Sequence, residues 1–178
     1  MKFEVFGPYY LSTKSIIRRD HVVSLREEVA ESDCGGILST APGCYVFGVK
    51  PSGAQRVIPW YVGKAERQPV IKEATNDQHL QLYNEIFDSY HNGSPALYFL
   101  PSTTPKGRPT ALATAGGNKP AIEFLEDWLI AACLKTNPLL WNVKKTRLLR
   151  ELYVRGIFNP RKGDLNTAAG SFKKCIGV

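Results

Sequence analysis

The sequence has no apolar run as long as the roughly 18 residues that a membrane-spanning helix needs, so it predicts no transmembrane segment. The four cysteines lie far apart, without the paired spacing of a zinc site, which favours reduced and buried thiols. The first residues also lack the layout of a secretion signal, and we therefore expect a cytoplasmic protein. There are no coiled-coil heptads, internal repeats or low-complexity segments, so nothing in the sequence points to a particular oligomeric state.

Basic charge is present, and it is unevenly placed. Residues 1–142 contain 14 basic and 14 acidic residues, whereas residues 143–178 contain nine basic and two acidic ones, so this last stretch carries the whole net charge of +7. Such a basic end, which begins at Lys144 and Lys145, suits a polyanion because phosphate contacts release counterions. It predicts contact with nucleic acid, and the alternative is a solvated surface that keeps the protein in solution.

The apolar periodicity and the turn residues predict alternating strands and helices in one domain, residues 1–178. The expected strands are 3–11, interrupted at Gly7-Pro8, then 45–49, 57–62, 96–100 and a brief one at 142–143. The expected helices are 20–31, 69–90 with a bend or break at Asn76-Asp77, 120–136, 147–154 and 165–176. The order predicts an α/β (α+β) fold, in which helices flank a small mixed or antiparallel sheet. We expect the three tryptophans in the core, and Ala168, Phe172 and Ile176 on the inner side of the last helix.

Two strand segments each place a tyrosine beside a glycine, in Gly43-Cys44-Tyr45 and in Tyr61-Val62-Gly63-Lys64. The connection between them contains Pro51, Ser52 and Gly53, which is typical of a β-hairpin. Tyr45 and Tyr61 can then lie side by side on one face of the hairpin. Pro59 indicates that the second strand is an edge strand or carries a bulge.

Two further segments follow in order, Leu125-Glu126-x-x-Leu129-Ile130 and, from Asn137-Pro138, the stretch that ends at Asn142. On its own, Glu126 is typical of an ordinary helix surface. Together with the tyrosine segments, however, the four elements resemble the GIY-YIG nuclease superfamily. The resemblance covers about residues 43–142, and residues 1–40 and 143–178 are extensions beyond the family's core.

The resemblance implies roles for the matching residues. One of Tyr45 and Tyr61 would activate the attacking water as general base and the other would support the phosphate or that water; the sequence does not determine which. A phenol has a pKa of about 10, so a nearby cation such as Lys64 would have to favour the phenolate. Gly63 would let the backbone approach the phosphate.

Glu126 matches the family's metal-binding glutamate and would hold Mg²⁺ or Mn²⁺. Asn142 matches an asparagine that braces the site.

The sequence departs from the family at one important position. The family's arginine on the first core helix corresponds to Ile71, and the nearest cations are Lys72 and Arg67. Lysine keeps the charge but cannot grip a phosphate with two parallel hydrogen bonds. His79 is offset from the family's usual histidine position and is a weaker candidate for the site.

These features together predict a metal-dependent endonuclease that hydrolyses phosphodiester bonds in nucleic acid, with DNA the expected substrate. Because the arginine is missing, a second hypothesis is a nucleic-acid-binding protein of the same fold without cleavage. A third, from another class, is a protein-interaction module whose basic end meets an acidic partner.

Overall fold

The computed structural model divides the chain into two units, Met1–Trp141 and Asn142–Val178. It describes residues 1–11, 16–89, 93–142, 146, 151 and 166–176. The boundary between the units falls beside the end of the region that carries the motifs. The described part of the chain contains no helix with the length and apolar character needed to cross a membrane.

An antiparallel sheet forms the centre of the first unit. Its strands are β1 (Lys2–Phe3), β2 (Phe6–Tyr10), β3 (Gly43–Pro51), β4 (Ile58–Ala65) and β5 (Gly93–Thr103). The strand order is β1-β5-β3-β4, β2 also pairs with β5, and each described pairing is antiparallel. The predicted fold class, a small α+β domain with an antiparallel sheet flanked by helices, is confirmed.

The hairpin of β3 and β4 follows the sequence closely. Its register places Tyr45 opposite Gly63, and it shifts after Phe47 so that Gly48 faces Pro59. Proline has no N–H for the ladder, which explains both the irregularity and the place of β4 at the end of the strand order. Both parts of the expectation from Pro59 are confirmed.

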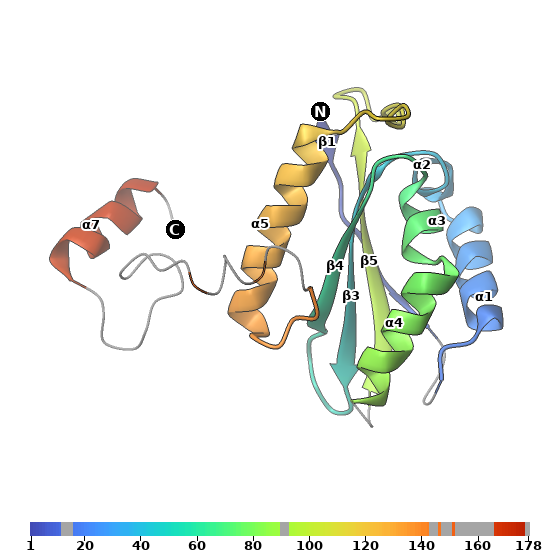
Figure 1. The fold of residues 1–178 in the computed structure, drawn as a ribbon, viewed down its shortest axis with the longest axis horizontal. Coiled ribbons are helices and arrows are strands. Elements are labelled where there is room, and N and C mark those ends of the chain that lie inside the picture. The colour runs from blue at the N-terminus through green and yellow to red at the C-terminus, as the bar shows by residue number, and fades with distance from the viewer. Residues whose placement is uncertain (12–15, 90–92, 143–145, 147–150, 152–165, 177–178) are drawn as a thin grey trace. The chain divides into compact units, whose positions relative to one another are not determined.

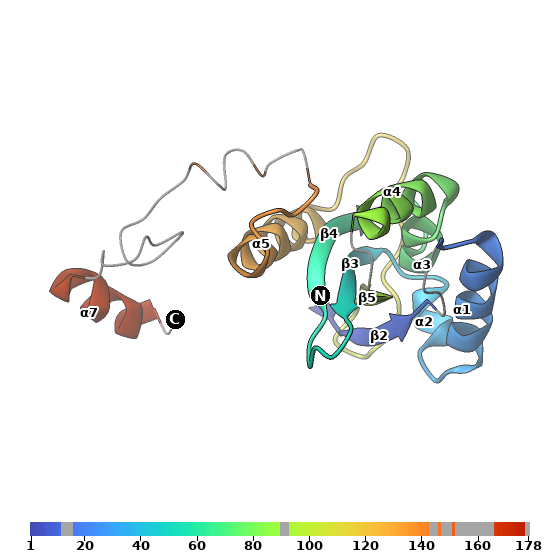
Figure 2. The ribbon, with the colours of Figure 1, turned by 90° about the horizontal axis from the view of Figure 1, so that it is seen from below.

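Helices cover both faces of the sheet (Figures 1 and 2). On one face lie α1 (Arg19–Glu31), α2 (Gly35–Leu38), α3 (Val70–Ala74) and α4 (Asp77–Asp88), and on the other lies α5 (Pro120–Thr136). The predicted break at Asn76-Asp77 is confirmed, because Asn76 ends the turn after α3 and caps α4 through its side chain. Pro120 begins α5, where its missing N–H costs no hydrogen bond.

Helix α5 buries its apolar stripe but not Trp128, which the sequence predicts in the core. Ile122 and Leu129 are buried, as the apolar stripe predicts, but Trp128 is 58% exposed. Trp128 directly precedes Leu129, and one residue along a helix rotates the side chain by about a quarter turn. The core position expected for Trp128 is therefore wrong, while Trp60 is buried as expected.

The second unit contains the helix α7 (Thr167–Ile176). Ala169 is buried, whereas Ala168 is exposed and Phe172 and Ile176 are 51% and 45% exposed. The inward prediction for these three residues is therefore wrong.

Candidate active site

The two motif tyrosines lie on the same face of the hairpin. Their ring centroids are 6.3 Å apart and their planes are inclined by 43°. Tyr61 is opposite Phe47, two residues from Tyr45, so the tyrosines form a diagonal cross-strand pair. The predicted juxtaposition is confirmed. Tyr45 is 1% exposed, and Tyr61 is less deeply buried.

The ring of Tyr45 leaves room only for glycine at position 63. A Cβ atom at position 63 would lie 2.2 Å from Cζ and 2.3 Å from the hydroxyl oxygen of Tyr45. The phenol thus occupies the space that any other residue would fill. The sequence suggested that Gly63 admits a phosphate, but the structure gives it a role that needs no ligand.

His79 on α4 completes this cluster. Its Nε2 atom lies 2.7 Å from the hydroxyl oxygen of Tyr45, and the two rings meet edge to face with centroids 5.4 Å apart. The Oδ1 atom of Asn76 accepts a hydrogen bond from the backbone N–H of His79 and lies 2.9 Å from Nδ1. Because an amide oxygen can only accept, Nδ1 carries the proton, Nε2 is the acceptor, and the hydroxyl of Tyr45 donates to it.

A carboxylate lies near the imidazole of His79, on the side of its Nδ1 atom. Oε1 of Glu73 is 3.9 Å from Nδ1 of His79, and Gln68 donates a hydrogen bond to Oε2 of Glu73. Burial lowers the pKa of His79, and the charge of Glu73 opposes this effect. His79 is therefore neutral at pH 7 and can take up a proton.

Lys64 projects toward the carboxylates near α5. Its Nζ atom lies 3.4 Å from Glu66, 3.6 Å from Glu123 and 4.0 Å from Glu126. Glu123 and Glu126 are three residues apart on α5 and so face the same side. Lys64 is therefore an ammonium that three carboxylates share, and Glu126, with a side chain 14% exposed, is partly shielded from water.

The phenols are held in their neutral form. Burial is the largest cause of the raised pKa of Tyr45, and the nearby Tyr83 and Tyr61 add to it. The pKa of Tyr61 is raised by burial first and by the charge of Glu126 second. Glu126 is thus close enough to act on Tyr61 electrostatically. Lys64, which the sequence suggested would favour a phenolate, is surrounded by carboxylates instead.

The donor chemistry beside Lys64 is compatible with a hard divalent cation. Mg²⁺ prefers oxygen ligands, commonly one or two carboxylates, and completes its shell with water and phosphate. Glu126 and Glu123 provide carboxylate oxygens of this kind. Within the described residues, no group of three or more His, Cys, Asp or Glu residues is arranged to hold a metal ion.

The remaining predicted residues lie outside this cluster. Arg67 is exposed in the turn after β4, and it makes no hydrogen bond or ion pair with another described residue. Lys72 is exposed on α3 and lines a pocket between helices, while Ile71 beside it is packed in the core. Asn142 belongs to the second unit, where it is buried and accepts a hydrogen bond from Thr146 at its backbone carbonyl. Its role at the site stays a prediction.

Lys144 and Lys145 lie outside the described residues.

Sequence reasoning missed two members of the cluster. For Asn76 the sequence pattern predicts only a bend or break of the helix. An asparagine three residues before a histidine is, however, the spacing of a helix cap whose side chain also reaches the imidazole. Tyr83, which the spacing along α4 places inward, stacks on Phe47 with centroids 4.0 Å apart. Its hydroxyl is buried without a hydrogen-bond partner among the described residues, and no sequence signal distinguishes it from a core aromatic.

No model of a known protein family matches the chain, and no curated protein and no solved structure matches it either. The function proposed below therefore depends on the geometry of the site and on the motif resemblance.

Proposed function

We propose that the protein is a metal-dependent phosphodiester hydrolase of the GIY-YIG type that acts on nucleic acid, with DNA the expected substrate. One observation carries the proposal: Tyr45 and Tyr61 of one hairpin meet His79 of α4, and Lys64 of the same hairpin lies 4.0 Å from Glu126 of α5. Packing alone does not call for this arrangement, because each buried hydroxyl and charge has to be compensated.

The hydrogen bond between Tyr45 and His79 supports a route for the proton of the attacking water. As water attacks phosphorus, the oxygen of Tyr45 accepts a proton from it, while the proton of Tyr45 passes to Nε2 of His79. This route needs no preformed phenolate, which the raised pKa of Tyr45 disfavours. Asn76 holds His79 in the tautomer that can accept the proton. Tyr61 lies beside the pair and would orient the water or the phosphate.

Glu126 would hold the Mg²⁺ or Mn²⁺ ion, and Glu123, which also contacts Lys64, lies three residues before it on α5. When bound, the cation stabilises negative charge on the phosphate and on the leaving oxygen. Lys64 would exchange a carboxylate for a phosphate oxygen as the substrate arrives, since all three of its ion pairs are longer than 3 Å. The basic residues of the second unit would bind the backbone without reading sequence.

A cytoplasmic setting is part of the same proposal, and it is supported by the four cysteines, which are free thiols.

A cleavage assay tests the proposal. The full chain is incubated with supercoiled plasmid and with labelled single-stranded and double-stranded oligonucleotides, in Mg²⁺, in Mn²⁺ and in EDTA. The variants are Glu126→Gln, Tyr61→Phe and His79→Gln, and we expect each to lower the cleavage rate by about 100-fold or more, the scale of a lost acid–base or metal contact. The matched controls are Glu85→Gln, an exposed glutamate on α4, and Tyr10→Phe, a 40% exposed tyrosine on β2.

The outcomes separate the three hypotheses from the sequence. Cleavage that is unchanged in Glu126→Gln and Tyr61→Phe would show that the site is assigned wrongly. If there is no cleavage with either metal but DNA binding depends steeply on salt, the chain is a binding protein on this fold. If it neither cuts nor binds DNA, an interaction module with an acidic partner is the remaining explanation.

A further inference from the structure

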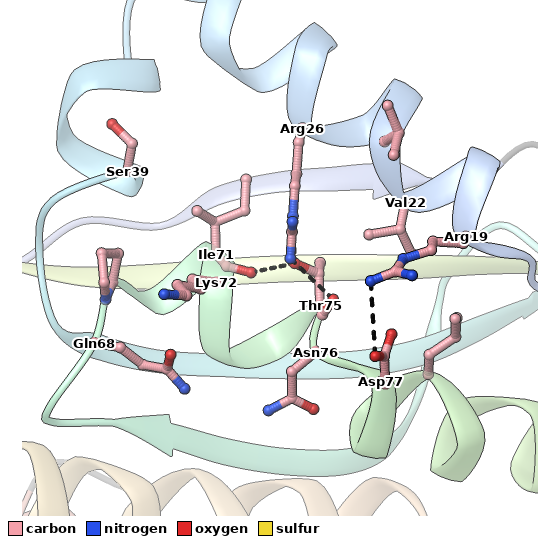
Figure 3. Close-up of a pocket in the computed structure, with 13 residues that line it drawn as sticks. Arg19, Val22, Arg26, Ser39, Gln68, Ile71, Lys72, Thr75, Asn76 and Asp77 are labelled. Atoms are coloured by element: carbon pink, nitrogen blue, oxygen red, sulfur yellow. Dashed lines mark hydrogen bonds and ion pairs between the residues drawn. The ribbon is translucent and has the colours of Figure 1, made fainter.

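A pocket of about 410 Å³ lies beside the candidate active site, between α1, α3 and α4 (Figure 3). Its size is within the range of small-molecule sites in proteins. Residues from α1 line one side, and residues from α3 and from the start of α4 line the other. Helix α1 precedes the region that resembles the nuclease family, so the resemblance assigns this pocket no role.

Arg26 of α1 is held in place on the pocket wall. Its Nε donates to Oγ1 of Thr75 at 2.9 Å, and its Nη2 donates to the carbonyl of Thr75 at 3.0 Å. Thr75 is 6% exposed and its hydroxyl also bonds to the carbonyl of Ile71, so the anchor is rigid. Among the described residues, Nη1 of Arg26 donates no hydrogen bond. A fixed guanidinium with an unused donor suits a phosphate oxygen.

Two more cations line the same pocket. Lys72 is exposed and makes no ion pair with another described residue. Arg19 lies 3.8 Å from Asp77, but the side chains are 81% and 80% exposed, so water screens this pair. The lining contains three basic residues and one acidic residue, so its formal charge is 3 − 1 = +2.

The pocket shares a wall with the active-site cluster. Gln68 and Asn76 line it, and the same two side chains bond to Glu73 and His79 behind the tyrosines. We propose that the pocket binds a phosphate group of the nucleic-acid strand, one adjacent to the bond that is cut. The arginine that the first core helix lacks would thus be compensated by Arg26 and Arg19 of α1 together with Lys72. That the pocket binds a phosphate follows from its lining residues. That this phosphate belongs to a nucleic-acid strand rests on the proposed function.

The test measures binding without cleavage. Fluorescence anisotropy follows a labelled 20-nucleotide DNA against the full chain in EDTA, from 50 to 200 mM salt. The variants Lys72→Gln and Arg19→Gln should each weaken binding and reduce the slope of log affinity against log salt by about 1, the effect of one lost phosphate contact. Lys135→Gln on α5, which also removes one exposed basic charge, should leave the slope unchanged. Circular dichroism of each variant checks the fold.

Equal slopes for wild type, Lys72→Gln and Arg19→Gln would overturn the proposal, as would an equal loss in Lys135→Gln. A competition with adenosine monophosphate identifies the source of the phosphate. The pocket does not bind a nucleic-acid strand if binding of the nucleotide depends on Lys72 but binding of the oligonucleotide does not. If the oligonucleotide binds through the pocket but is never cut, the pocket stands and the nuclease proposal fails.

Discussion

The contact between Gly63 and Tyr45 allows a prediction that depends only on the fold. In the variant Gly63→Ala the added Cβ would lie 2.2 Å from Cζ of Tyr45, far inside van der Waals contact. The ring cannot move away freely, because its hydroxyl is bonded to His79 and the residue is 1% exposed. The hairpin or the phenol therefore has to shift.

Two effects of opposite sign decide the magnitude. Alanine restricts the unfolded chain more than glycine does, which stabilises a compatible site by about 0.4–1 kcal/mol. Overpacking a full core costs about 1–3 kcal/mol, and the methyl group meets an aromatic ring carbon rather than the end of a flexible chain. We expect the clash to dominate, so that Gly63→Ala lowers the free energy of unfolding by about 1–2 kcal/mol.

Urea denaturation followed by circular dichroism measures this change. Gly36→Ala is a matched control, because Gly36 is exposed on α2 and an added Cβ there meets nothing within 4 Å. This variant should be as stable as wild type or slightly more stable. The midpoint of unfolding should therefore fall for Gly63→Ala and not for Gly36→Ala.

A second substitution tests the cause. In Tyr45→Val the ring is absent, so adding Gly63→Ala to that variant should cost much less than it does in wild type. The difference is the coupling free energy of a double-mutant cycle. The explanation fails if Gly63→Ala unfolds at the same urea concentration as wild type, or if the two substitutions are additive.

Two further predictions concern the support of His79. Asn76→Ala removes the cap of α4 and should cost about 1 kcal/mol in urea denaturation, whereas Asn76→Asp keeps an accepting oxygen and should recover most of the loss; equal stability of the two variants would contradict the role of the cap. Burial lowers the pKa of His79 in the folded protein below its unfolded value of about 6.5. As the pH falls through that value, the unfolded chain therefore binds more protons than the folded chain does. The free energy of unfolding decreases toward acid pH as a result. Between pH 7.5 and pH 5 the wild type should therefore lose more stability than the variant His79→Gln does. Glu73 and Tyr45 are present in both proteins, so the comparison isolates the titration of His79. Equal losses in the two proteins would refute this linkage.

The local elements follow from the sequence with few errors, because they depend on neighbouring residues. The turn residues between Val49 and Val57 predict the hairpin, and its register then sets Tyr45 and Tyr61 on one face. Asn76 and Pro120 mark helix starts through hydrogen bonds within a few residues. The sequence does not predict the short helix α2, because its glycine-rich segment has no helical periodicity.

The contacts that make the cluster chemically distinctive join segments far apart in the chain. His79 bonds to Tyr45 across 34 residues, and Arg26 bonds to Thr75 across 49. Local spacing offers no signal for such pairs, because the sheet and the helices that cover it determine which side chains meet. The sequence by itself therefore determined the hairpin, its tyrosine pair and the fold class. Only the tertiary structure decided that His79 joins the tyrosines and that Lys64 lies among carboxylates, since long-range packing fixes both.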